Sequence, residues 1–155
     1  MKITNLERGQ SLFEVVVAVA ITALIIVAIV SLAVNSIQNS NYSRNKTSSS
    51  TYSQQATEWL RGQRDIDPGD FFGTYATVLA PSGYCLPTLA WTPSVADAVH
   101  GCTAKIPGTI FTRWVTFNRS VQNGKTVVGT DVTVSWSDSQ GIHQVTDSTN
   151  LADTR

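Results

Sequence analysis

The stretch from Gly9 to Val34, GQSLFEVVVAVAITALIIVAIVSLAV, decides the fold of this chain. From Val15 to Val30 its only polar residue is Thr22. At about 1.5 Å of helix per residue, the apolar run is long enough for a bilayer core of roughly 30 Å, and we expect a membrane-spanning helix at residues 10–34. Glu14 lies at its start, where an ionised carboxylate in lipid costs about 2.5 kcal/mol or more unless it is paired. The pattern therefore predicts a partner for this carboxylate.

The residues before the apolar run set the expected orientation. Lys2 and Arg8 outweigh Glu7 there, and basic residues in this position keep that end of a helix in the cytoplasm. A cleaved secretory signal would have a shorter apolar core, of about 7 to 15 residues, and a small-residue cleavage site after it. An uncleaved signal anchor fits the hydropathy equally well, and only the spacing of Gly9 and Glu14 argues against it.

The hexapeptide Gly9–Glu14 resembles the processing site of type IV prepilins and of the pseudopilins of type II secretion. The resemblance covers the stretch from Leu6 to Val34. It implies cleavage after Gly9 by a prepilin peptidase, N-methylation of the new terminal residue Gln10, and a role for Glu14 in assembly. Two features of this chain depart from the family. The first mature residue is usually Phe or Met in the family but would be Gln10 here. Many major pilins carry a proline in the apolar segment, and this chain has none there.

The resemblance implies a structural subunit, minor rather than major, of a type IV pilus or a related filament. The implied partners are other pilin subunits in a helical filament, the prepilin peptidase, the inner-membrane assembly platform and, before assembly, membrane lipid. It implies no cofactor. The chain would cross the inner membrane once, with its N-terminus on the cytoplasmic side and its C-terminal domain outside, periplasmic or extracellular once in the filament. The alternative is a membrane-anchored or pilus-tip adhesion module that binds through the loop from Phe71 to Pro107.

Composition narrows the remaining functions. With 155 residues, 42% hydrophobic content and zero net charge, the chain can form one modest domain beyond the helix. From Asp65 onward five Lys and Arg residues oppose eight Asp residues, so 5 − 8 = −3, which argues against a general nucleic-acid surface. The chain has no HExxH motif or phosphate loop, and His100 and His143 are isolated. We therefore expect no enzymatic activity, and we expect Asp138 to act in a turn.

The helix is expected to continue beyond the membrane segment. Neither glycine nor proline occurs between Gly9 and Gly62, so we predict an outer helical half at residues 35–62 that ends at Gly62. Ser, Thr and Asn dominate its first part, which predicts fraying near Ser48 or a linker. Farther along, one apolar stripe with helical spacing is formed by Tyr52, Ala56, Trp59 and Leu60.

Residues 63–155 are expected to form a small exported β domain. The alternation in FTRWVTFNR places Phe111, Val115 and Phe117 on one face, and Asn123-Gly124 is a strong hairpin signal. The next strand has an apolar face formed by Val128, Val132, Val134 and Trp136. A third, weaker strand is expected at 142–146. The predicted fold is therefore α+β, a long N-terminal helix packed on a small antiparallel sheet, and pilins have this architecture.

The segment from Phe71 to Pro107 contains four prolines and is expected to be irregular. Short apolar pieces such as residues 77–80 suggest that it includes one short strand. A helical turn is expected at 95–100. It holds the only cysteines, Cys85 and Cys102, and on the exported side of a membrane we expect them to form a disulfide rather than remain two free thiols.

Three carboxylates precede this segment. They are Asp65, Asp67 and Asp70. Oxygen ligands so close together are a weak calcium candidate, but the EF-hand spacing and its distal glutamate are missing. A solvated turn is the favoured interpretation of this segment.

Overall fold

The computed structural model describes residues 10–122 and 124–153, with side chains from residue 12 onward. The first element is helix α1 (Gln10–Ile66). Contacts divide the chain into two compact units, Met1–Ser43 and Arg44–Arg155, and α1 contributes to both. The two units are described separately.

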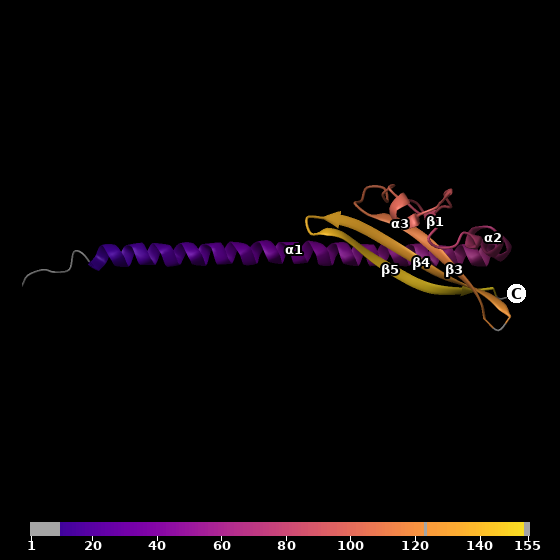
Figure 1. Cartoon of the computed structure of the whole chain (residues 1–155), viewed down its shortest axis with the longest axis horizontal. Helices are drawn as coiled ribbons and strands as arrows, with labels where there is room; N and C mark the ends of the chain where they lie inside the picture. Colours follow the sequence, from indigo (N-terminus) through magenta and orange to yellow (C-terminus); the bar gives the residue numbers. More distant parts are fainter. Residues whose placement is uncertain (1–9, 123, 154–155) are drawn as a thin grey trace, which may run out of the picture. The chain divides into compact units, whose positions relative to one another are not determined.

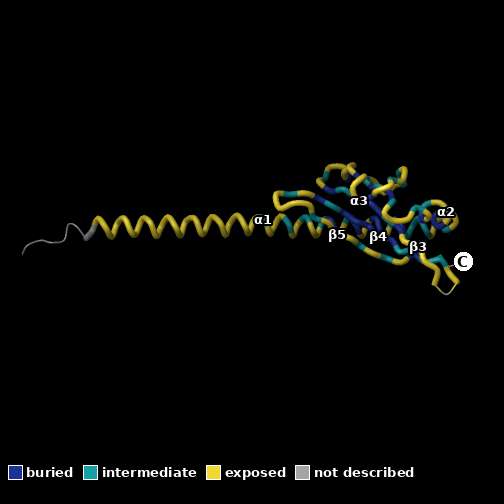
Figure 2. Tube along the Cα trace, viewed as in Figure 1, coloured by how far each residue is buried: buried dark blue, intermediate teal, exposed yellow. Residues whose placement is uncertain are grey.

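In the first unit, α1 is one uninterrupted apolar helix. Every described residue from Leu12 to Ile37 is exposed, including Leu24 at 72% and Leu32 at 69% (Figure 2). Within the described residues this is the one helix long and apolar enough to cross a membrane, a property shared by signal sequences and by core helices of soluble proteins.

The second unit is built on a five-stranded antiparallel sheet in the order β2-β1-β3-β4-β5 (Figure 1). Its strands are β1 (Gly83–Cys85), β2 (Ser94–Val95), β3 (Thr112–Gln122), β4 (Lys125–Asp138) and β5 (Gly141–Ala152). Between α1 and the first strand lie α2 (Pro68–Gly73) and the 3-10 helix η1 (Tyr75–Thr77), and α3 (Ala98–Gly101) follows β2. The chain is thus α+β, as the sequence predicts.

The core lies between the second half of α1 and one face of the sheet. The predicted stripe supplies Ala56 and Leu60, both fully buried, with Trp59 packed at the margin. The strands supply the residues that alternation places on one face: Val115, Phe117, Val128, Val132 and Leu151. Helical and strand periodicity therefore meet in one core, which confirms the predicted packing.

The prediction that α1 frays near Ser48 is wrong, because the helix is continuous there. Small hydroxyl side chains one turn apart bring this part of α1 close to the sheet: Ser49 is fully buried, Ser53 is 1% exposed and Thr57 is 3% exposed. Thr57 Oγ1 donates to Asp147 Oδ2 on β5 at 2.6 Å. Tertiary packing thus overrides the low helix propensity of serine and threonine.

The predicted end of α1 at Gly62 is also wrong, because the helix continues to Ile66. Pro68 ends it, since a proline pushes the preceding residue out of the helical region, and Asp67 has φ −140° and ψ 85°. The predicted turn is therefore a helix-to-helix junction, in which Pro68 starts α2.

The segment after α2 is more ordered than the sequence suggests. Residues 77–80 form no strand beyond an isolated bridge between Leu79 and Phe117, and β1 lies after them. The expected helical turn at 95–100 is displaced, since Val95 belongs to β2 and α3 begins at Ala98. α3 covers the outer face of the sheet, where Ala98, Cys102 and Trp114 form a second buried cluster.

Cys85 and Cys102 form the predicted disulfide, with their Cα atoms 5.4 Å apart. We expect replacement of both cysteines by serine to lower the free energy of unfolding by about 3 kcal/mol, since the bridge closes a ring with a sequence separation of 17. Urea unfolding followed by tryptophan fluorescence measures this change. A reductant should bring the wild type to the same midpoint and leave the double variant unaffected. An unchanged wild-type midpoint would contradict the prediction.

The C-terminal strands confirm the predicted hairpin and extend the third strand. Gln122 pairs with Lys125 across the turn, where Gly124 has φ +76° and Asn123 lies outside the described residues. The expected third strand at 142–146 is too short, because β5 continues to Ala152 and pairs with β4 along its whole length.

Candidate functional site

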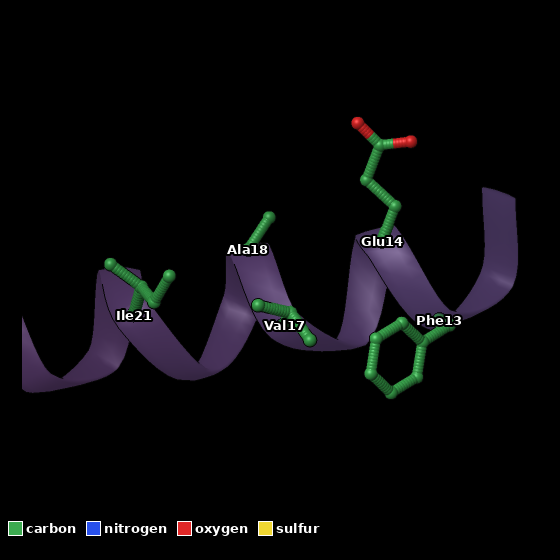
Figure 3. Close-up of a pocket in the computed structure, with 5 residues that line it drawn as sticks. All are labelled: Phe13, Glu14, Val17, Ala18 and Ile21. Carbon is green, nitrogen blue, oxygen red and sulfur yellow. The ribbon is translucent and has the colours of Figure 1, made fainter. Parts of the chain in front are cut away.

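The residue predicted to act in assembly, Glu14, lies on the first turns of α1. Figure 3 shows its side chain pointing away from the helix, on the same side as Ala18, with Phe13 on another side. These residues line an open surface pocket together with Val17 and Ile21. Within the described residues the Glu14 carboxylate makes no hydrogen bond or ion pair, and the pocket around it is otherwise apolar.

The predicted processing site consists of Gly9 and Gln10. Gly9 lies outside the described residues. Gln10 begins α1, so the helix starts at the residue that cleavage after Gly9 would make the new N-terminus. Gln10 and Glu14 are separated by four residues in one continuous helix, and residues at this separation lie on the same face.

Two polar side chains in the membrane-length part of α1 form hydrogen bonds within the helix. Thr22 Oγ1 donates to the carbonyl oxygen of Ala18 at 2.7 Å, and Ser31 Oγ donates to that of Val27 at 2.9 Å. Glu14 has no such local solution. Its carboxylate thus needs a partner other than a backbone carbonyl of its own helix.

Two of the three aspartates considered as calcium ligands have other roles. Asp67 is the N-cap of α2 and its Oδ1 accepts from the backbone N–H of Asp70 at 2.9 Å. Asp65 pairs with Arg64. Among the described residues no group of three or more His, Cys, Asp or Glu side chains could hold a metal ion.

Both histidines pair with aspartates in turns. His143 Nε2 lies 3.0 Å from Asp138 Oδ1, which also accepts from the backbone N–H of Gln140 at 2.8 Å. His100 Nδ1 lies 2.8 Å from Asp97 Oδ2 at the N-cap of α3. Asp138 thus has the role in a turn that the sequence predicts.

These contacts lower the pKa of both aspartates. The backbone N–H of Gln140, and then the ring of His143, lower the pKa of Asp138 below its ordinary value. The hydrogen bond from the ring of His100, and then the backbone N–H of His100, lower the pKa of Asp97. Both pairs stabilise the ionised carboxylate.

We expect the second unit to lose stability as the pH falls below about 4. The folded-state pKa of Asp97 and Asp138 lies below the unfolded value of about 3.9, so their contribution is complete above that pH and is lost as the pH falls through the folded-state pKa. The Asp97→Asn, Asp138→Asn double variant keeps neutral acceptors. Its urea midpoint should be below that of the wild type near neutral pH and converge with it in acid. A constant difference would contradict this sign.

Arg113 is a buried cation that sequence reasoning did not single out. Its side chain is 3% exposed, and its Nε and Nη1 donate to the carbonyl oxygens of Leu86 and Tyr52, each at 3.0 Å. Burial lowers the pKa of Arg113. It connects α1 to the segment after β1. The sequence does contain a sign of this burial: Arg113 is two residues before Val115 in an alternating strand, so both side chains lie on the same face.

An aromatic cluster also escaped sequence reasoning. Trp91 stacks on Tyr75 with ring centroids 3.9 Å apart and contacts Trp59, and its Nε1 donates to Gln63 Oε1 at 3.2 Å. The cluster fixes the irregular segment between β1 and β2 to the core.

No protein-family model, no curated protein and no solved structure matches this chain. The geometry of α1 and of the sheet therefore supplies the structural basis for a functional proposal.

Proposed function

We propose that this chain is a structural subunit of a type IV pilus or of a related pseudopilus-like filament. In this proposal the leader 1–9 is removed by a prepilin peptidase, residues 10–34 anchor the chain in the inner membrane, and the same helix then packs in the filament. The C-terminal unit would face the periplasm or the outside. The α+β layout, a long apolar helix and a small antiparallel sheet, supports this class.

The observation that carries the proposal is the single charge on the apolar part of α1. Between Gln10 and Ser43 the only Asp, Glu, Lys, Arg or His residue is Glu14. An anchor that only held the chain in lipid would gain nothing from a carboxylate at this depth, since it adds an insertion cost. A helix that packs against other copies gains a directional contact if a cation meets this carboxylate.

The cation in this proposal is the new amine at Gln10. Cleavage after Gly9 would create it four residues from Glu14. When helices bundle away from water, pairing of the amine with Glu14 of a neighbour, or within one chain, neutralises both charges. In a surrounding of low dielectric constant this attraction is strong enough to set the axial register of neighbouring subunits.

We expect the mature chain to begin at Gln10 and to contain 155 − 9 = 146 residues. Intact mass and N-terminal sequencing of protein from cells measure this directly, and the mass also reports methylation of the amine. Gly9→Leu should block cleavage, because a bulky side chain obstructs the bond beside the membrane. Mature protein that retained Met1, or that began near Val34, would refute the proposed class.

A further inference from the structure

The strand at one end of the sheet, β5, has an outer edge that no strand covers within the described residues. Its neighbour on the inner side is β4, and β5 is terminal in the strand order. The pairing runs without a break from Val127↔Ala152 to Asp138↔Gly141, so no bulge distorts it. The opposite edge strand, β2, has only two residues. A long regular edge is a template for the addition of another strand.

Alternation in the ladder identifies the backbone groups that point outward. The N–H of Asp153 bonds to the carbonyl oxygen of Thr126 at 3.0 Å, so odd-numbered residues of β5 bond inward to β4. Even-numbered residues therefore direct N–H and C=O away from the sheet. We call these groups of Ile142, Gln144 and Thr146 the open β5 edge; all three side chains are exposed.

The open β5 edge has none of the usual protection against pairing, and its surroundings are acidic. From Thr126 to Asp153 the sequence has no Lys, Arg or Pro and has four Asp residues. Lysine, proline and bulges are the devices that blunt natural edges. The cation that reaches β5 from α1, Arg61, contacts Thr149 and is paired with Glu58.

The chain also carries a basic strand edge of similar length. β1 covers β3 only from Trp114 to Thr116, and Leu79 bridges Phe117. The β3 tip, residues 118–122, extends beyond them and is exposed, with Val121 at 70%. Arg119 and Lys125 lie on this hairpin; Arg119 makes one long bond, of 3.4 Å, to the carbonyl oxygen of Phe72.

The β3 tip also directs backbone groups outward. The carbonyl oxygen of Phe117 accepts from the N–H of Ala80 at 2.9 Å, so odd-numbered residues of β3 point away from β4. Those of the tip are Arg119 and Val121. A parallel strand bonds each such residue to two outward-pointing residues of its neighbour. Pairing Ser120 with Gln144 satisfies this rule and leaves the helix-facing residues of both strands on one side.

We propose that the open β5 edge binds the β3 tip of a second copy of this chain by parallel strand addition. The contact joins an acidic edge to a basic one, whereas two β5 edges would bring like charges together. It is heterologous, so it repeats from copy to copy instead of closing a dimer. The inference goes beyond the proposed function, because the contact requires neither cleavage nor Glu14.

Variants of the full chain with one added cysteine test this contact, because both native cysteines are held in the Cys85–Cys102 disulfide. Ser120→Cys and Gln144→Cys are purified separately in detergent, mixed and oxidised mildly, so that even a short-lived contact is trapped as a disulfide-linked dimer. We expect the mixture to form dimers in clear excess over a mixture of Thr88→Cys and Gln144→Cys, because Thr88 is exposed and lies outside the proposed contact. Equal yields from the two mixtures would overturn the proposal. Gln144→Cys alone giving as much dimer as the first mixture would also overturn it, in favour of a β5–β5 pair.

A charge pair of variants tests the basis of recognition. Ile142 belongs to the open β5 edge and its side chain is 80% exposed, so Ile142→Lys and Ile142→Glu change the charge of the contact without disturbing the core. In the Gln144→Cys background we expect the lysine to lower the yield with Ser120→Cys about fivefold relative to the glutamate. Equal yields would show that charge does not govern the contact, and the argument for the β3 tip as the strand that binds the open β5 edge would fail.

Discussion

Glu14→Ala is expected to abolish incorporation of this chain into filaments while leaving synthesis, cleavage and membrane insertion intact. Removal of the carboxylate leaves the amine of a neighbouring subunit unpaired in an apolar bundle, and breaking a buried pair in this way costs about 3–5 kcal/mol. That is more than about a hundredfold in the assembly equilibrium for each contact. The membrane fraction and sheared filaments, probed with one antibody, measure both parts of the prediction.

Thr22→Ala is the matched control for this variant. Thr22 is also a polar residue in the apolar part of α1, but its hydroxyl donates to the carbonyl oxygen of Ala18 within the same helix. We expect Thr22→Ala to assemble normally. Normal incorporation of Glu14→Ala would refute the charge-pairing mechanism, whatever the outcome for cleavage at Gly9.

Gly83→Ala should destabilise the second unit, Arg44–Arg155, by about 3 kcal/mol or more. Gly83 is buried in β1, and a Cβ there would overlap the carbonyl oxygen of Val115 and lie 3.0 Å from Ala98 Cβ. The overlap is with backbone, so no side-chain rotation relieves it. β1 would have to separate from β3. Urea unfolding followed by tryptophan fluorescence reports on this unit alone, because all four tryptophans of the chain lie between Arg44 and Arg155.

The same substitution at Gly62 is the control, and its expected effect has the opposite sign. Gly62 lies in the interior of α1, and no atom outside its own helical backbone lies within 4 Å of the position that an alanine Cβ would take. Alanine is favoured over glycine in a helix by about 1 kcal/mol, so Gly62→Ala should raise the unfolding midpoint. The different surroundings of the two glycines thus give the same substitution opposite expected effects. A Gly83→Ala variant as stable as Gly62→Ala would show that β1 does not pack as described.

Periodic patterns account for the parts of the fold that the sequence predicts. The apolar run of α1, the stripe at Ala56 and Leu60, and the alternation in β3 and β4 each repeat with the period of their element. The Asn123-Gly124 turn and the disulfide follow from local chemistry, because few residues accept a positive φ and the chain has just two cysteines.

Contacts that are distant in sequence account for the errors. The length of β5 was underestimated because its helix-facing side contacts polar groups of α1: Asp147 meets Thr57, and Thr149 meets Arg61. An alternation of polar with polar residues has no hydropathy signal. The wrong prediction of fraying in the serine-rich part of α1 also comes from distant contacts. There the low helix propensity of serine is outweighed by burial against the sheet.

For the candidate site, sequence spacing singled out Glu14, and the structure adds its exposure and its apolar neighbours. Arg113 was missed, since a cation in an alternating strand is usually assigned to the solvent face. Its burial depends on two carbonyl oxygens, of Tyr52 and Leu86, that no local pattern brings together.

The disulfide also determines where this protein tolerates change. Because the Cα atoms of Cys85 and Cys102 are only 5.4 Å apart, the segment between them begins and ends at nearly one place, and within it β2 pairs with β1. The part of this segment ahead of Trp91 can therefore change in length without moving β1 or β3. Trp91 is fixed in the aromatic cluster, but Thr88, Leu89 and Ala90 are exposed ahead of it. This short stretch is where the surface of the second unit can diversify, or accept an inserted epitope, while the rest of the unit stays the same.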